Sequence, residues 1–256
     1  MLTVPVMVQA QPVTGLYVAG GAGLNWLTDS DGGNLQSFID STDINPNNLG
    51  LTPSGGFNAS FDLGFAGVLS IGWGFGNGLR LEIEGNYRSN EADSASGVAG
   101  WASIGAPGGR QESWGVMGNA LLDLGVFGPV IPYVGVGAGY VVTDWAGIRG
   151  VSQNGALRMT VNDRDGRFAY QGIAGLAFPL GFAPGLSVTA EYRFLGTLQP
   201  QLRARFDNPA TGATVATGTV EPDNFNHSLM LGLRYSFARP AASAAPTPAA
   251  APQAPR

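Results

Sequence analysis

The sequence predicts an all-β protein, an eight-stranded antiparallel up-and-down β-barrel that spans a membrane. Residues 61–75 (FDLGFAGVLSIGWGF) alternate between large apolar and small or polar side chains, and successive side chains of a strand point to opposite faces. A tilted membrane strand needs about 9–11 residues, whereas a soluble strand has about 5–6. Glycine makes up 40 of the 256 residues, and only 12% are charged, which is unusual for a soluble domain.

The chain contains no uninterrupted apolar run of 18 residues, so the sequence does not predict a transmembrane helix. A closed barrel is the remaining way to cross a membrane, because lipid offers backbone groups no hydrogen-bond partner. Cysteine is absent, all 13 basic residues are arginine, and the net charge is −5. This negative balance argues against nucleic acid as a partner.

The segments before and after residues 61–75 show the same alternation. Residues 15–26 are glycine-rich, with Leu16 and Trp26 on one face. Residues 79–88 (LRLEIEGNYR) set leucine, isoleucine and tyrosine against arginine, glutamate and asparagine. Residues 113–126 place tryptophan, valine and leucine opposite polar positions. Each segment is predicted to form a strand with one lipid-facing face.

Four further strands complete the predicted barrel. Residues 132–143 are apolar or small on both faces, and residues 167–178 place aromatic residues and leucine opposite Gln171. Residues 186–194 and 225–237 alternate as clearly as 79–88. None of the eight segments shows the apolar periodicity of a helix.

The predicted connections alternate in length. Three are short, at residues 76–78, 127–131 and 179–185, and four are long, at residues 27–60, 89–112, 144–166 and 195–224. Short turns at one rim and long loops at the other are typical of outer-membrane barrels, whose long loops face outward. The localisation predicted is the outer membrane of a Gram-negative bacterium.

Aromatic residues lie near the predicted strand ends, as expected for side chains that settle at the membrane interface. They are Trp26, Trp73, Phe75, Tyr87, Trp114, Trp145, Tyr192, Tyr235 and Phe237. The alternative is a soluble calycin-like barrel with a ligand cavity, in which the apolar faces point inward.

The inward faces are predicted to hold a network of charged side chains. Its members are Asp62, Arg80, Glu82, Glu84, Arg88, Asp123, Glu191, Arg193 and Arg234. An eight-stranded barrel is just wide enough for side chains to fill, and arginine bonds carboxylates bidentately. A plugged lumen is therefore the main expectation, and a weak pore for small solutes is the alternative.

These residues and several short motifs resemble the OmpA-like, opacity-type outer-membrane barrels. The motifs are GNYR at 85–88, PYVGVGAGY at 132–140, FAYQGIAG at 168–175 and NHSLMLGLRYSF at 226–237. The resemblance implies that the last strand is an assembly signal, with Leu231, Leu233, Tyr235 and Phe237, and that the barrel-assembly machinery and outer-membrane lipid are partners. An extracellular ligand of the loops is a further expected partner.

The composition of the two ends of the chain sets them apart from the barrel. Residues 1–10 are expected to be the remnant of a signal peptide, residues 14–237 the barrel, and residues 238–256 an Ala/Pro-rich disordered linker. Full OmpA-like proteins carry a peptidoglycan-binding domain after such a linker. The linker is present in this sequence and the domain is not, so a direct tether to the cell wall is not asserted. Because Phe237 is not the last residue, as it would be in a barrel-only protein, the sequence favours a lost C-terminal domain.

No cofactor, metal site or catalytic residue is expected. Acidic residues in 29–34 and 162–166 have oxygen atoms at alternate positions, but they lack the closing glutamate of a calcium loop. His227 and Ser228 are adjacent in a strand and point apart, which disfavours a lipid A-modifying enzyme. The expected function is structural, with surface loops that serve adhesion or envelope integrity.

Overall fold

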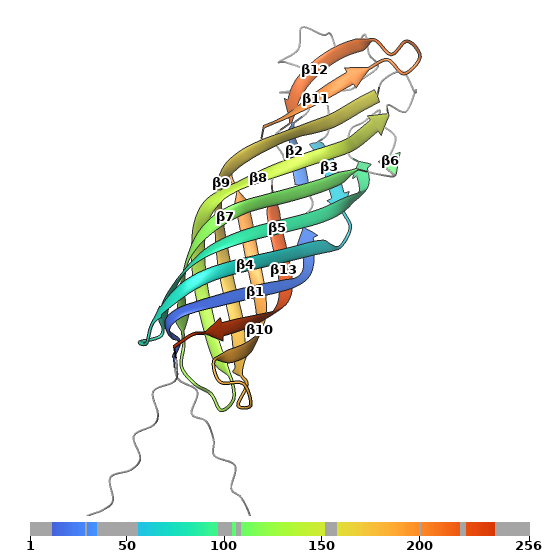
Figure 1. Ribbon diagram of the computed structural model, residues 1–256. Helices are drawn as coiled ribbons and strands as arrows, with labels where there is room; N and C mark the ends of the chain where they lie inside the picture. The colour runs from blue at the N-terminus through green and yellow to red at the C-terminus, as the bar shows by residue number, and fades with distance from the viewer. Residues whose placement is uncertain are drawn as a thin grey trace, which may run out of the picture.

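The computed structural model describes residues 12–28, 30–34, 56–96, 104–105, 109–151, 158–199, 201–220 and 224–238. Eight long antiparallel strands form the barrel: β1 (Thr14–Leu27), β4 (Gly64–Phe75), β5 (Leu79–Ser96), β7 (Arg110–Asp123), β8 (Ile131–Val151), β9 (Arg158–Pro179), β10 (Leu186–Thr197) and β13 (Phe225–Ser236). Each pairs with its neighbour in the chain, and β1 pairs with β13, so the sheet closes on itself (Figure 1). The predicted fold class is confirmed.

Five shorter strands lie at the rim that carries the long connections. They are β2 (Ser30–Asn34), β3 (Gly56–Phe61), β6 (Ile104–Gly105), β11 (Leu202–Asp207) and β12 (Thr214–Val220). β3 pairs with the end of β5, and β11 pairs with the start of β9 and with β12. Among the described residues, no helix is long and apolar enough to cross a membrane.

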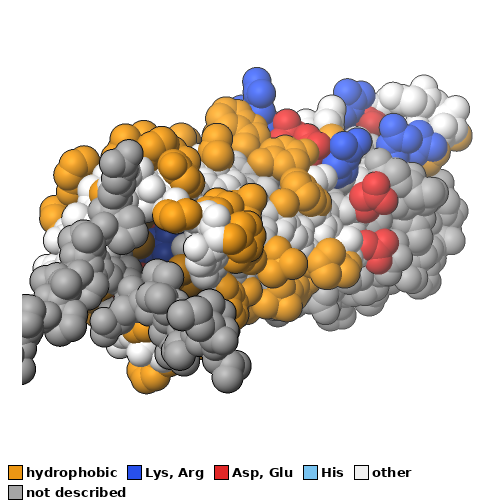
Figure 2. All heavy atoms as spheres, turned by 60° about the horizontal axis from the view of Figure 1, so that its bottom comes forward, with side chains coloured by type: hydrophobic (Ala, Val, Ile, Leu, Met, Phe, Trp, Pro, Cys, Tyr) orange, Lys and Arg blue, Asp and Glu red, His pale blue; other side chains and the backbone are white. Residues whose placement is uncertain are grey.

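Burial follows the alternation that the sequence predicts. On β4 and β5, Leu69 is 70% exposed and Ile83 is 64% exposed, whereas Arg80 and Glu84 are at most 1% exposed. The large apolar side chains therefore cover the outside of the barrel, where Figure 2 shows them as a broad band. Because the apolar faces point outward, the calycin-like alternative is wrong.

The turn between β4 and β5 shows why glycine is needed at the short-turn rim. Gly76 and Gly78 have φ angles of 77° and 94°, a left-handed conformation that side chains with a Cβ disfavour. The Asn77 side-chain oxygen accepts a 3.0 Å hydrogen bond from the Leu79 backbone N–H. The turn therefore closes on its own backbone without a longer loop.

Several strands extend beyond the boundaries that the sequence predicts. β5 continues to Ser96, and β8 and β9 remain paired as far as Val151 and Arg158. Residues 144–151 and 158–166, expected as loop, are strand instead. Backbone pairing continues past the membrane, where both faces can be polar and the alternation that marks a lipid-facing strand is lost.

One further difference concerns a single position. Trp145, expected at the membrane interface, is 1% exposed and lies on the inward face of β8, because it shares its parity with buried Val141 and Thr143. The predicted leader 1–10 lies outside the described residues, as does the predicted linker 238–256 except for Ala238.

Candidate functional site: the filled lumen

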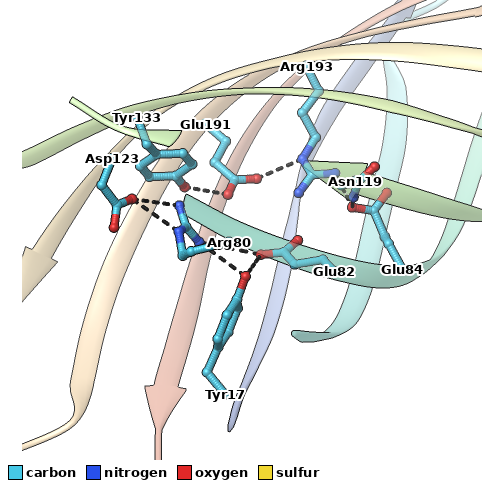
Figure 3. Close-up of polar contacts among 9 residues, drawn as sticks. All are labelled: Tyr17, Arg80, Glu82, Glu84, Asn119, Asp123, Tyr133, Glu191 and Arg193. Atoms are coloured by element: carbon cyan, nitrogen blue, oxygen red, sulfur yellow. Dashed lines mark hydrogen bonds and ion pairs between the residues drawn. The ribbon is translucent and has the colours of Figure 1, made fainter. Parts of the chain in front are cut away.

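The lumen contains a first polar group centred on Arg80 of β5. Its guanidinium lies 3.0 Å from the Asp123 carboxylate and 3.4 Å from that of Glu82. It also lies against the rings of Tyr133 and Tyr17, at 4.8 and 5.6 Å from their centroids (Figure 3). Residues of strands β1, β5, β7 and β8 thus meet at one side chain.

A second polar group is centred on Arg193 of β10. Its guanidinium bonds the carboxylates of Glu84 and Glu191, and its side chain is only 3% exposed. The Tyr133 hydroxyl donates to Glu191, which links this group to the one around Arg80 (Figure 3). Asn119 also donates to Glu84, at 2.9 Å. One continuous network therefore spans the lumen.

The remaining predicted lumen residues differ in their contacts. Arg88 is 1% exposed and donates to the Asn86 side chain at 3.0 Å, and Arg234 is 3% exposed. Asp62 lies between β3 and β4 with an exposed side chain, so the structure does not place it in the buried network. It precedes the first inward position of β4, and alternation alone did not show where that strand begins.

Without Asp62 the formal charges inside the lumen cancel. The network holds four arginines (Arg80, Arg88, Arg193 and Arg234) and four carboxylates (Glu82, Glu84, Asp123 and Glu191). Arg80 and Arg193 each contact two carboxylates. This balance limits the energetic cost of holding ionised groups away from bulk water.

A layer of amide side chains near the long-loop end was not predicted. Asn25 donates to Asn90 at 2.6 Å and to Asn226 at 2.8 Å, and Asn224 accepts from Gln111 at 3.1 Å. All five side chains are at most 4% exposed. The available indication was asparagine or glutamine at inward positions near the strand ends, but partners so far apart in sequence could not be assigned from it.

The predicted assembly-signal residues lie on the outer face of the last strand. Leu231 is 69% exposed, Leu233 54% and Tyr235 43%. Phe237 follows the end of β13, with its ring edge-on to that of Tyr235 at 5.1 Å. These four side chains are positioned to contact lipid or another protein in the membrane.

His227 and Ser228 lie on opposite sides of the barrel wall. The Ser228 hydroxyl donates to Asn25 inside the lumen at 2.7 Å. The His227 ring lies outside, 2.7 Å from the Tyr192 hydroxyl and stacked on Trp26 with 5.8 Å between centroids. This separation prevents a direct nucleophile–base contact between the two residues.

The acidic pair in the segment 162–166 has a backbone role. The Asp163 carboxylate accepts from the Arg203 N–H at 2.9 Å, and the Asp165 carboxylate accepts from the Gln201 N–H at 2.8 Å. Among the described residues, no group of three metal-ligating side chains is arranged around a common point. The carboxylates here fix β11 against β9.

The lipid-facing wall, the filled polar lumen and the closed antiparallel sheet define a transmembrane β-barrel of the outer-membrane type. The chain belongs to the outer membrane protein beta-barrel domain family, whose model matches residues 1–237. The protein is therefore an outer-membrane protein of a Gram-negative bacterium.

Two relatives illustrate the similarity. An "Outer membrane protein" of Gluconacetobacter diazotrophicus is 36% identical over 249 residues, which cover 93% of this chain and 61% of the relative. An uncharacterized protein of Brucella abortus is 30% identical over 142 residues, which cover 50% of this chain and 48% of the relative. The chain thus spans less than two thirds of the length of these relatives.

Two solved structures are similar at low sequence identity. Neisserial surface protein A has a TM-score of 0.48 and 14% identity, and the match covers 89% of this chain and 100% of that one. OprG of Pseudomonas aeruginosa has a TM-score of 0.49 and 13% identity, and the match covers 88% and 98%.

Proposed function

We propose that the protein is a non-conducting structural barrel that presents a surface-exposed sheet for adhesion or envelope integrity. The observation that carries this proposal is the filled lumen. The charged network and the amide layer leave Arg80, Arg193 and Asn25 each at most 3% exposed. In a barrel of eight strands, such packing fills the interior that a conducting path would need.

Conductance across planar lipid bilayers tests the closed lumen. We expect the refolded full chain to insert without discrete current steps. Insertion is checked independently by heat-modifiable mobility on a gel, since a closed barrel resists SDS until it is boiled. Stable current steps from the heat-modifiable form would establish the weak small-solute pore instead.

The β11–β12 hairpin supports a surface role. It rises from the rim opposite the short turns, so it stands outside the membrane if the long connections face outward (Figure 1). We expect that replacing residues 201–223 with a short Gly-Ser linker abolishes attachment of cells to a surface while the barrel still assembles. If attachment is unchanged, the hairpin is not the interacting element.

A catalytic role is not part of the proposal. His227 and Ser228 face opposite sides of the wall, and Ser228 is bonded to Asn25. We expect His227→Ala to leave the acyl-chain pattern of lipid A unchanged, as measured by mass spectrometry of extracted lipid. A changed pattern would reinstate the lipid A-modifying alternative.

The proposal includes recognition of the last strand by the barrel-assembly machinery. The alternating exposed side chains Leu231, Leu233 and Tyr235, followed by Phe237, support this role. Outer-membrane lipid is the second proposed partner, because the apolar outer wall has no protein covering it in the described part of the chain.

A further inference from the structure

The part of the sheet that extends beyond the lipid-facing apolar side chains, on the side of the long connections, has one strongly basic face. In this region β8, β9 and β11 lie side by side. Val161 and Ala204 are paired and at most 1% exposed, which fixes the inward face. In the adjacent row, Thr160 pairs with Arg149 on one side and Arg205 on the other. These two arginines are therefore neighbours across one strand, on the outward face.

Three more arginines share that outward face because side chains alternate along a strand. Arg158 and Arg164 have the parity of Thr160 on β9, and Arg203 has the parity of Arg205 on β11. All are exposed. The arginine face is defined here as Arg149, Arg158, Arg164, Arg203 and Arg205. It holds five of the 13 basic residues in a chain whose net charge is −5.

Acidic side chains offset only part of this charge. Asp144 is paired with Arg164 across the strands, and Asp207 is paired with Arg158. The Arg205 guanidinium lies 2.8 Å from the Asp207 carboxylate and lowers the pKa of that carboxyl. Among the described residues, two carboxylates against five guanidiniums leave an excess of three positive charges on this face.

Other nearby carboxylates are engaged elsewhere. Asp163 and Asp165 have the opposite parity on β9 and accept hydrogen bonds from backbone N–H groups. Glu112 of β7 contacts Arg110 at 3.1 Å and accepts from the Tyr87 hydroxyl at 2.9 Å. The arginine face therefore keeps donors directed toward solvent, since Arg205 exposes 57% of its side chain even in its ion pair.

The arginine face begins directly above the lipid-facing belt. Phe168 is 51% exposed and Tyr170 40% exposed on the same face of β9. Arg164 precedes Phe168 by four residues on β9, which is about 13 Å along a strand and less along the membrane normal because barrel strands are tilted. Figure 2 shows the boundary: hydrophobic side chains cover the girth of the barrel, and Lys/Arg-coloured side chains gather beyond them.

We propose that the arginine face binds the phosphate groups of anionic glycolipid in the outer leaflet that surrounds the barrel. Phosphate suits this surface because guanidinium forks bond it bidentately and remain charged. The outward direction of the side chains favours a ligand that lies beside the barrel, in the same leaflet, over one above its mouth. Bound lipid phosphate would hold the extension of β8 and β9 against the membrane surface.

Lipid A binding to the full chain in nonionic maltoside micelles tests this proposal by native mass spectrometry. The probes are diphosphoryl lipid A, the same lipid without phosphates, and a soluble sulfated oligosaccharide. The test variant is Arg149→Gln/Arg205→Gln. The control is Arg110→Gln/Arg167→Gln, which removes the same charge from two arginines outside the arginine face. Heat-modifiable mobility confirms that each variant is folded.

We expect diphosphoryl lipid A to bind wild type and control equally, and the test variant about tenfold more weakly, which corresponds to about 1.4 kcal/mol. The dephosphorylated lipid should show no difference between variants. Equal loss in test and control, or equal binding of the dephosphorylated lipid to wild type, would overturn the proposal. Variant-dependent binding of the oligosaccharide without lipid A binding would also overturn it.

Discussion

Removing Arg193 should destabilise the barrel by leaving two carboxylates buried without a cation. The guanidinium bonds Glu84 and Glu191, whose side chains are 0% and 14% exposed. Taking one partner out of a buried ion pair costs about 3–5 kcal/mol. We expect Arg193→Met to lower the free energy of unfolding by that amount, because methionine fills much of the volume but supplies no charge.

Reversible urea unfolding of the protein in neutral lipid vesicles measures this loss. The fluorescence of Trp73 and Trp114, both more than half exposed on the outer wall, reports transfer from lipid to water. The matched control is Arg205→Met, whose side chain is 57% exposed in its ion pair with Asp207; such a surface pair contributes about 0–1 kcal/mol.

A rescue variant separates lost charge from lost packing. Arg193→Met/Glu84→Gln/Glu191→Gln keeps similar side-chain volumes and removes the two unpaired charges. We expect it to recover most of the stability. If Arg193→Met itself unfolds within about 1 kcal/mol of wild type, the buried ion-pair reasoning is wrong, because the lumen then solvates its carboxylates as bulk water does.

Three other changes probe the wall and the last strand. Leu69→Arg places a cation on the lipid face and should cost about 2–4 kcal/mol near mid-bilayer, whereas Leu79→Arg near the short-turn rim should cost about 0–1; equal losses in urea unfolding would contradict the assigned depths. Phe237→Ser should slow appearance of the heat-modifiable form in a pulse-chase experiment, whereas Phe182→Ser, 85% exposed and outside the last strand, should not; normal assembly of Phe237→Ser would remove the targeting role. Gly72→Ala would place its Cβ 2.4 Å from the Tyr17 ring. It should lower the free energy of unfolding by about 1–3 kcal/mol because the ring must move, whereas Gly67→Ala on the outer wall should be nearly neutral. Equal losses of stability would mean that the lumen is loosely packed.

The alternation of residues 61–75 and 79–88 was sufficient to predict the barrel and to assign its faces. One face of a membrane-barrel strand contacts lipid and the other contacts the polar lumen, so apolar and polar residues alternate along the sequence. The same rule placed Arg80, Glu84 and Arg193 inside before any contact was known. It also placed His227 and Ser228 on opposite sides of the wall.

The alternation of apolar and polar residues no longer marks a strand where the strands leave the membrane. On β9, residues 158–166 come before Phe168 and lie outside the membrane, where both faces can be polar. The sequence therefore predicts a loop there, although these residues are strand. The arginine face arises in this region, since Arg149 and Arg205 become neighbours only through the pairing of β8, β9 and β11.

The sequence by itself determined which side chains face lipid and which face the lumen, because that choice depends only on position along each strand. The tertiary structure decided which of them meet. Arg80 reaches Asp123, and Arg193 reaches Glu84 from 109 positions away, because strand register and barrel closure set the distances across the lumen. The amide layer around Asn25 was decided in the same way.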